Sequence, residues 1–239
     1  MCPADHDVLE STIVPILLMD GEDPVEFCGT GFLFPKQVFV TAWHCVERQI
    51  KAGQRFIGAP RVAGKFKSWR LADLAQDANG SDLALARVDA EPALPFRLSA
   101  EGRLIGHDVW TYGYPLTESR RDHDGLLHFT LHGRVLRGYA TRTFDFTHQR
   151  FGVVSSYELD MPTPGGLSGA PLLLPGTHEV IGVVYGSHQV QSADAGGEVP
   201  ERVTIWSVTF GLAHRSKTLR AARGPATQGK ALADYLEAP

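Results

Sequence analysis

Several features that would narrow the class of this protein are scarce or absent in its sequence. No excess of basic residues points to nucleic acid, because 23 Lys and Arg stand against 27 Asp and Glu, for a net charge of −4. No apolar run approaches the roughly 20 residues that span a bilayer. The longest, Ile13–Met19, is interrupted by Pro15. We therefore expect neither a nucleic-acid partner nor a membrane partner.

The N-terminal segment also lacks the marks of a secretory signal. Its first twenty residues carry the acids Asp5, Asp7 and Glu10 in place of lysine or arginine, and no small-residue cleavage site follows. The sequence therefore predicts a cytoplasmic protein, or a secreted one if a targeting segment has been removed.

Cysteine is rare, and the three cysteines do not decide the redox compartment. Cys2 is expected to be a free thiol in a polar segment. Cys28 and Cys45 would close a loop of about 17 residues if oxidised, which stabilises by roughly 3 kcal/mol. A reducing cytoplasm disfavours such a bond, so both redox states stay open.

Long segments with helical periodicity are missing as well. Gly and Pro together make up about a sixth of the residues and fall between short apolar runs, which is typical of strands joined by turns. These runs predict strands at Thr12–Met19, Gly29–Phe34, Val38–Trp43, Arg55–Ala59, Leu83–Val88, Asp108–Tyr112, Leu126–Arg137, Phe151–Leu159, Pro171–Leu174, Val180–Tyr185 and Val203–Val208. Without helices between them, βαβ crossovers are excluded and the fold class is all-β, a sandwich or a barrel.

Two segments organise the chain around these strands. The polar stretch Pro92–His107 separates two strand-rich halves and is the candidate linker. Near the C-terminus, Thr227 is a candidate cap for a short helix in which Leu232, Tyr235 and Leu236 recur at helical spacing. The basic residues just before it are interpreted as solvated surface, with a docking surface for an acidic partner as the alternative; they are Arg215, Lys217, Arg220 and Arg223.

Three local patterns carry the chemistry. The hairpin Gly29–Val40 leads into Thr41-Ala42-Trp43-His44, and the histidine side chain is suited to a general base near neutrality. Asp82 is followed at once by an apolar strand, the setting for a carboxylate held at a barrel edge. In Gly165-Gly166-Leu167-Ser168-Gly169, glycines on both sides of a serine let backbone N–H groups turn toward its hydroxyl and bind an oxyanion. Each pattern alone has an ordinary structural interpretation.

Together the three patterns follow in the order His44, Asp82, Ser168, and the chain resembles the chymotrypsin/trypsin-like serine proteases over most of its length. Trp110–Pro115 and Ile181–Gly186 resemble further segments of that family. Thr163–Pro171 is most similar to the glutamyl endopeptidases, and the regions of Tyr112 and Asp160 are similar to the high-temperature-requirement proteases.

The resemblance implies two six-stranded antiparallel β-barrels with a short C-terminal helix. Residues 1–100 would form the barrel that carries His44 and Asp82, residues 101–213 the barrel that carries Ser168, and residues 214–239 a basic segment and the helix. Ser168 would be the nucleophile, His44 the base and Asp82 its partner, with the N–H groups of Gly166 and Ser168 as oxyanion hole. No metal or organic cofactor is required.

The departures from the family concern activation and specificity. Leu167 replaces the Asp that captures a new N-terminus in zymogens. Trp43 replaces a small residue and is expected to pack against Cys45 and the barrel wall, with a substrate subsite as the alternative. Pro162 stands where trypsin has its specificity Asp, and Val184 where glutamyl endopeptidases have a His. An uncharged pocket is predicted, taking a small or apolar residue before the scissile bond, although His188 lies close enough in sequence to contact an acidic one. The expected substrate-binding residues are Pro162, Thr163, Val184, Tyr185 and Gly186.

The interpretation is therefore a serine endopeptidase of restricted specificity, acting on a protein or peptide substrate under the control of an activating or regulatory protein. A catalytically silent binding or scaffold module on the same fold is the alternative. An α/β-hydrolase is disfavoured, because its serine elbow needs Gly where Ala170 stands and its triad begins with the serine.

Overall fold

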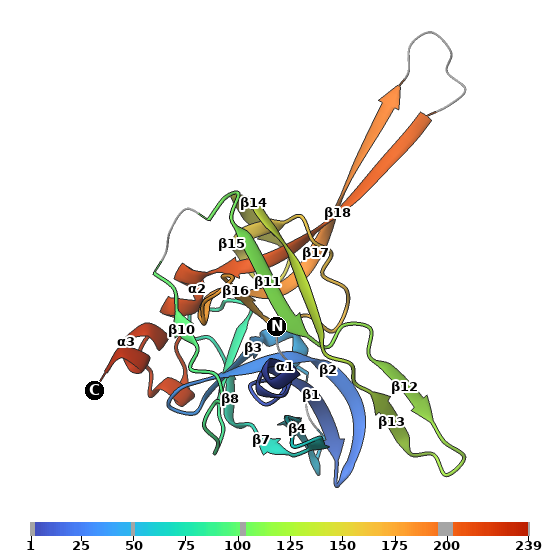
Figure 1. The fold of residues 1–239 in the computed structure, drawn as a ribbon, viewed down its shortest axis with the longest axis vertical. Coiled ribbons are helices and arrows are strands. Elements are labelled where there is room, and N and C mark those ends of the chain that lie inside the picture. The colour runs from blue at the N-terminus through green and yellow to red at the C-terminus, as the bar shows by residue number, and fades with distance from the viewer. Residues whose placement is uncertain (1–2, 49–50, 101–103, 196–202, 239) are drawn as a thin grey trace.

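A computed structural model of the chain describes residues 3–48, 51–100, 104–195 and 203–238. Two large sheets, built mostly from antiparallel strands, make up the body, and short helices cover its edges (Figure 1). The predicted all-β class is confirmed.

The first sheet curls into a barrel. Its strands, in spatial order, are β7 (Trp69–Arg70), β4 (Gln54–Gly58), β1 (Ile13–Asp20), β2 (Asp23–Phe34), β3 (Val38–Ala42), β9 (Leu83–Arg87) and β8 (Ala72–Gln76). Only Leu71 separates the edge strands β7 and β8 along the chain. The two edges are therefore formed by one chain segment, which brings the sheet back on itself.

The second sheet is a closed barrel with one added strand. Its strands, in spatial order, are β10 (Arg97–Leu98), β17 (Glu179–Ala195), β16 (Pro171–Leu173), β11 (Asp108–Gly113), β14 (Arg134–His148), β15 (Gly152–Leu159) and β18 (Val203–Arg215). The pairing of β17 with β18 closes a ring of six, and β10 joins β17 in parallel outside it. The two-barrel architecture implied by the resemblance is confirmed, with one short strand more in each sheet.

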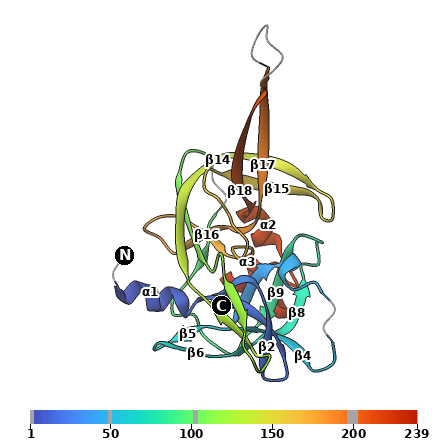
Figure 2. The same ribbon diagram turned by 90° about the vertical axis from the view of Figure 1, so that its right-hand side faces the viewer.

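Small hairpins and one long hairpin leave the body. The two-stranded pairs are β5 (Arg61–Val62) with β6 (Lys65–Phe66) and β12 (Glu118–Arg121) with β13 (Leu127–Thr130). The outer parts of β17 and β18 project away from both barrels (Figures 1 and 2). The single strand predicted at Leu126–Arg137 is wrong: it is divided into β13 and β14. Gly133, between them, lies so close to β11 that an added Cβ would be 1.7 Å from the Tyr112 hydroxyl.

The helices are short. They are α1 (Pro3–Glu10), α2 (Ser216–Ala221), α3 (Leu232–Glu237) and the 3₁₀ turns η1 (Trp43–Cys45) and η2 (Pro225–Thr227). The C-terminal helix predicted from the sequence is present as α3, but Thr227 does not cap it, because its hydroxyl lies in the η2 turn and donates to the carbonyls of Gly224 and Lys230. Among the described residues, no helix is long and apolar enough to cross a membrane.

One hydrophobic cluster joins the two barrels. Phe32 and Phe34 of β2 pack in the same cluster as Tyr112 of β11 and Val183 of β17. The hydroxyl of fully buried Tyr114 also donates to the carbonyl of Ile13 across the junction, at 3.2 Å. The barrels therefore meet over a packed interface that fixes the chain segments at its rim.

Candidate active site

Strand pairing brings His44 and Asp82 together. β3 and β9 are antiparallel with Ala42 opposite Leu83, so the residues just after β3 lie beside the residue just before β9. The N–H of His44 donates to Asp82 Oδ1 at 2.9 Å, and His44 Nδ1 lies 2.7 Å from Asp82 Oδ2. The carboxylate is therefore bonded to both the backbone and the ring of the histidine, and it fixes the direction of the imidazole.

The electrostatics of the pair follow from its burial. The Asp82 side chain is 2% exposed and that of His44 is 31% exposed. Burial alone would raise the pKa of Asp82, but the nearby His214 ring and the hydrogen bond with His44 outweigh it and lower the pKa to about 2. Burial alone would lower the pKa of His44, but its hydrogen bond with Asp82 outweighs this and raises the pKa above its ordinary value. The pair thus joins an ionised carboxylate to a strengthened base.

The loop between β15 and β16 carries Ser168. The N–H of Gly169 donates to the carbonyl of Val184 at 2.7 Å, and the N–H of Thr30 donates to the carbonyl of Ser168 at 2.9 Å. Gly169 has a φ of +88°, and a Cβ there would lie 2.0 Å from the Thr30 carbonyl oxygen. Only glycine fits at this close approach between the two barrels.

A second set of contacts orients the peptide groups that precede Ser168. The N–H of Leu116 donates to the carbonyl of Gly165 at 3.1 Å, so the N–H of Gly166 in the same trans peptide points away from Leu116. The hydroxyl of Thr30 donates to the carbonyl of Gly166 at 2.6 Å. Within the described parts of the chain, neither the Gly166 N–H nor the Ser168 N–H donates a hydrogen bond. Both amides are available to a ligand.

Ser168 lies beside the histidine turn, but its hydroxyl does not bond to His44. The Sγ of Cys45, the residue after His44, lies 3.6 Å from the Ser168 carbonyl oxygen. The Ser168 hydroxyl donates to the Tyr185 carbonyl at 3.5 Å, and this is its one hydrogen bond within the described residues. Bonds between a nucleophile and its base are often long in unliganded enzymes and tighten when substrate binds.

The expected substrate-binding residues lie around β17. Thr163 is buried and its hydroxyl donates to the carbonyl of Gly186, while Pro162 is exposed. Val184 is fully buried in the core of the second barrel. Tyr185 is also buried and contributes its carbonyl to Ser168. Thr163 thus joins the loop before Ser168 to β17.

His188 is engaged inside the protein. Its Nε2 lies 2.9 Å from the carboxylate of Glu158, which is buried and also accepts a hydrogen bond from Arg142 at 2.7 Å. The carboxylate that an acidic substrate side chain would supply is therefore already provided by Glu158.

Leu167 and Trp43 are accommodated by packing. Leu167 is fully buried in the core of the second barrel, and Trp43 packs against the cluster that contains Cys45, as expected. Cys28 and Cys45 are free thiols in the structure, and Cys2 lies outside the described residues.

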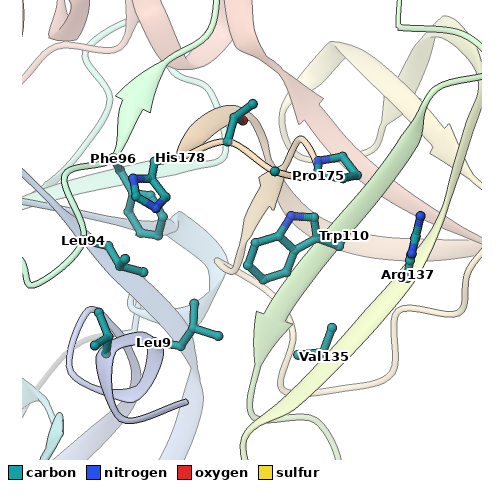
Figure 3. Close-up of a pocket in the computed structure, with 11 residues that line it drawn as sticks. Leu9, Leu94, Phe96, Trp110, Val135, Arg137, Pro175 and His178 are labelled. Atoms are coloured by element: carbon teal, nitrogen blue, oxygen red, sulfur yellow. The ribbon is translucent and has the colours of Figure 1, made fainter. Parts of the chain in front are cut away.

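A separate cavity of about 640 Å³ lies between α1 and the second barrel (Figure 3). Leu9 of α1, Trp110 of β11 and Phe96 supply apolar walls, and the polar residues Arg137 and His178 line opposite ends of the cavity (Figure 3). None of its lining residues is His44, Asp82 or Ser168.

One group of potential metal ligands occurs among the described residues. His6, Asp7 and Glu10 of α1 place ligand atoms within 4.8 Å of one another. The Glu10 carboxylate already pairs with Arg61 at 3.4 Å and with His6 at 3.5 Å. The Glu10 carboxylate of the group is therefore already engaged within the protein.

Sequence reasoning missed three residues of the site: Thr30, Leu116 and His214. Thr30 lies in the segment that leads to His44, but nothing in the local pattern links its hydroxyl to a loop 136 residues away. His214 could have been noticed in the sequence, because it directly follows the apolar strand residues Phe210–Ala213. Histidine is less often fully buried than the apolar residues, and His214 is fully buried.

Two all-β barrels that bring a histidine, an aspartate and a serine to their junction define the chymotrypsin-fold serine proteases as the class. Solved structures agree on the fold: the Rv3671c protease of M. tuberculosis in its active form has a TM-score of 0.58 and 19% identity, over 90% of this chain and 80% of that chain. The MamO protease domain of Magnetospirillum magneticum gives 0.57 and 15%, over 89% and 96%. The HtrA-type protease AlgW with a decapeptide gives 0.58 and 14%, over 89% and 64%.

The family follows from a direct match. The chain belongs to the trypsin-like peptidase domain family, whose model matches residues 29–183. No curated protein matches the chain in sequence. Family and fold together support a serine peptidase.

Proposed function

We propose that the chain is a serine endopeptidase in which Ser168 is the nucleophile, His44 the general base and Asp82 its partner. The observation that carries the proposal is the pair of hydrogen bonds between His44 and the buried Asp82 at the rim where the Ser168 loop meets the first barrel. A carboxylate bonded to Nδ1 leaves Nε2 as the proton acceptor, as a triad requires.

The mechanism begins with a rotation of the Ser168 side chain from the Tyr185 carbonyl toward His44. The hydroxyl oxygen attacks the scissile carbonyl carbon while His44 Nε2 takes its proton. The negative charge that develops on the carbonyl oxygen is bound by the N–H groups of Gly166 and Ser168. His44 then gives the proton to the leaving amine, and water repeats the sequence to free the acid and Ser168.

The same site supports a preference for a small or apolar residue before the scissile bond. Thr163 bridges to the Gly186 carbonyl and lies against Gly211, where an added Cβ would be 2.6 Å from the Thr163 methyl. Little room is left for a long side chain between these segments. Pro162 and Val184, which stand where trypsin and the glutamyl endopeptidases have their specificity residues, carry no charge. His188, the nearby histidine, is already paired with Glu158.

A peptide or protein is the substrate class we propose, and AlgW with its bound decapeptide is a structural neighbour that accommodates one. An activating or regulatory protein is proposed as well: it would favour the rotation of the Ser168 hydroxyl from the Tyr185 carbonyl toward His44, which substrate binding otherwise has to bring about. Within the basic run, the charge of Arg220 is already paired with Glu237 of α3 at 3.1 Å.

Fluorophosphonate labelling tests the proposal, because the probe reacts with a serine that its base has activated. We expect labelling of the native chain at Ser168, and its loss in Ser168→Ala and His44→Ala. Ser119→Ala, at an exposed serine of β12, is the matched control and should label normally. A folded native chain that stays unlabelled would contradict activity of the chain alone, and would indicate either a latent enzyme that awaits its activating partner or the binding or scaffold module.

A peptide library then tests the specificity. Cleavage should be dominated by sites after small or apolar residues. Cuts led by Arg, Lys or Glu would overturn that part of the proposal while leaving the triad intact.

A further inference from the structure

A second histidine stands against the Asp82 carboxylate from the opposite barrel. His214 lies near the end of β18, opposite Val183 of β17 and Ser156 of β15. Its Nε2 is 3.9 Å from Asp82 Oδ2, the oxygen that His44 Nδ1 also contacts. Asp82 thus has a histidine on each side, one from each barrel.

The surroundings of His214 give it no other hydrogen-bonding role. Its side chain is fully buried, and neither ring nitrogen has a hydrogen-bond partner among the described residues. An imidazole always carries at least one N–H, and burying that donor without an acceptor is costly. Asp82 Oδ2 is an acceptor about 1 Å beyond normal hydrogen-bond distance from Nε2.

The ring of His214 is also held in place. Tyr185 packs over it with ring centroids 4.4 Å apart, and the Tyr185 hydroxyl is fixed 2.7 Å from the Ser156 hydroxyl. Burial raises the pKa of Tyr185 to about 12, with the Asp82 charge acting in the same direction, so this phenol stays neutral. The ionisable groups that face His214 are therefore Asp82, with His44 behind it, and the neutral Tyr185.

We propose that His214 is a positioning residue: its Nε2–H donates to Asp82 Oδ2 and holds the carboxylate against His44 from the second barrel. This assignment rests on the proposed function and adds to it. A second donor shares the negative charge of the carboxylate, so the charge that stabilises protonated His44 is weaker than it would be with His44 alone. His214 would thereby keep more of the base unprotonated near neutral pH.

The test is the pH dependence of kcat/KM in His214→Leu, which removes the donor, and His214→Gln, which returns an amide N–H. In His214→Leu the acidic limb, set by His44, should move up by about half a unit to one unit. A one-unit shift lowers the unprotonated fraction below that limb roughly tenfold. His214→Gln should restore most of the wild-type profile.

Two further measurements keep the result interpretable. Val109→Ala, in the core of the second barrel, should lower the melting temperature without moving the acidic limb. NMR titration of the His44 ring in the wild type and His214→Leu gives the same shift without requiring turnover, so it reports on His214 even if fluorophosphonate labelling fails. An unchanged or lowered His44 pKa in His214→Leu would overturn the proposal, whatever the activity.

Discussion

At the scale of single residues, the proposed mechanism makes the His44–Asp82 pair the part of the site that determines how activity responds to pH. The hydrogen bond with the Asp82 carboxylate raises the pKa of His44 above its ordinary value near 6.5. His44 can accept a proton from Ser168 only when its ring is unprotonated, which requires a pH near or above this raised pKa. We expect the acidic limb of kcat/KM to lie above pH 6.5. Asp82→Asn removes the charge that raises the pKa, so the limb should move down while the rate falls by about 10⁴. A wild-type limb below pH 6, or one that Asp82→Asn leaves in place, would contradict this assignment.

The same pair contributes to stability in opposite pH windows. The lowered pKa of Asp82 means that its stabilising contribution is present above its unfolded value near 4 and is lost as the pH falls toward 2. The raised pKa of His44 contributes fully below about 6.5 and is lost as the pH rises through the folded value. Both contributions to the free energy of unfolding are fully present between about pH 4 and pH 6.5, so the pair stabilises the fold most in that range.

At the scale of elements, the loop before β16 depends on the backbone of Gly169. Alanine there would be strained at a φ of +88° and would meet the Thr30 carbonyl at 2.0 Å. Gly169→Ala should cost about 3 kcal/mol or more in the free energy of unfolding and abolish fluorophosphonate labelling. Gly176→Ala is the matched control, because Gly176 has a φ of +72° but nothing within 4 Å of an added Cβ.

Denaturant unfolding of both glycine variants measures the difference. The control should lose about 1 kcal/mol, from backbone strain alone, and keep its labelling. Equal losses in the two variants would show that the close approach to Thr30 contributes nothing.

Prediction from the sequence succeeded for many of the strands and failed for most of the short helices. The pattern of apolar runs and turns predicted many of the main strands of both barrels, but not their spatial order; in the structure, the antiparallel pairing of β3 with β9 places His44 beside Asp82. The short helices α1 and α2 were missed, because eight and six residues carry too little periodicity to detect. The close approach of Gly133, between β13 and β14, to the Tyr112 side chain is a contact with a distant strand, which no local pattern reveals.

At the scale of the whole molecule, the chemistry depends on contacts between the barrels that sequence order does not encode. The fully buried Thr30 belongs to the first barrel, yet its hydroxyl donates to Gly166 in the second and accepts from the N–H of Tyr114 at 3.2 Å. His214 faces Asp82 in the reverse direction. The first barrel thus positions the Gly166 loop of the second, and the second barrel places His214 against Asp82 of the first. Substitutions at these contacts should affect catalysis more than stability.

Thr30→Val tests this coupling. Removing an oxyanion-hole donor lowers the rate by ~10²–10³. Thr30 does not donate to the substrate but holds Gly166, the residue whose N–H is the proposed donor. We therefore expect a smaller effect, a roughly tenfold fall in kcat with KM little changed. The stability cost should be about 1–2 kcal/mol. Thr111→Val is the control, since the equally buried Thr111 hydroxyl donates to the Pro171 carbonyl at 2.8 Å, away from Gly166. If both variants lose similar stability but only Thr30→Val loses kcat, the first barrel positions the oxyanion loop of the second. Equal losses of kcat would mean that any buried hydroxyl near the junction matters alike.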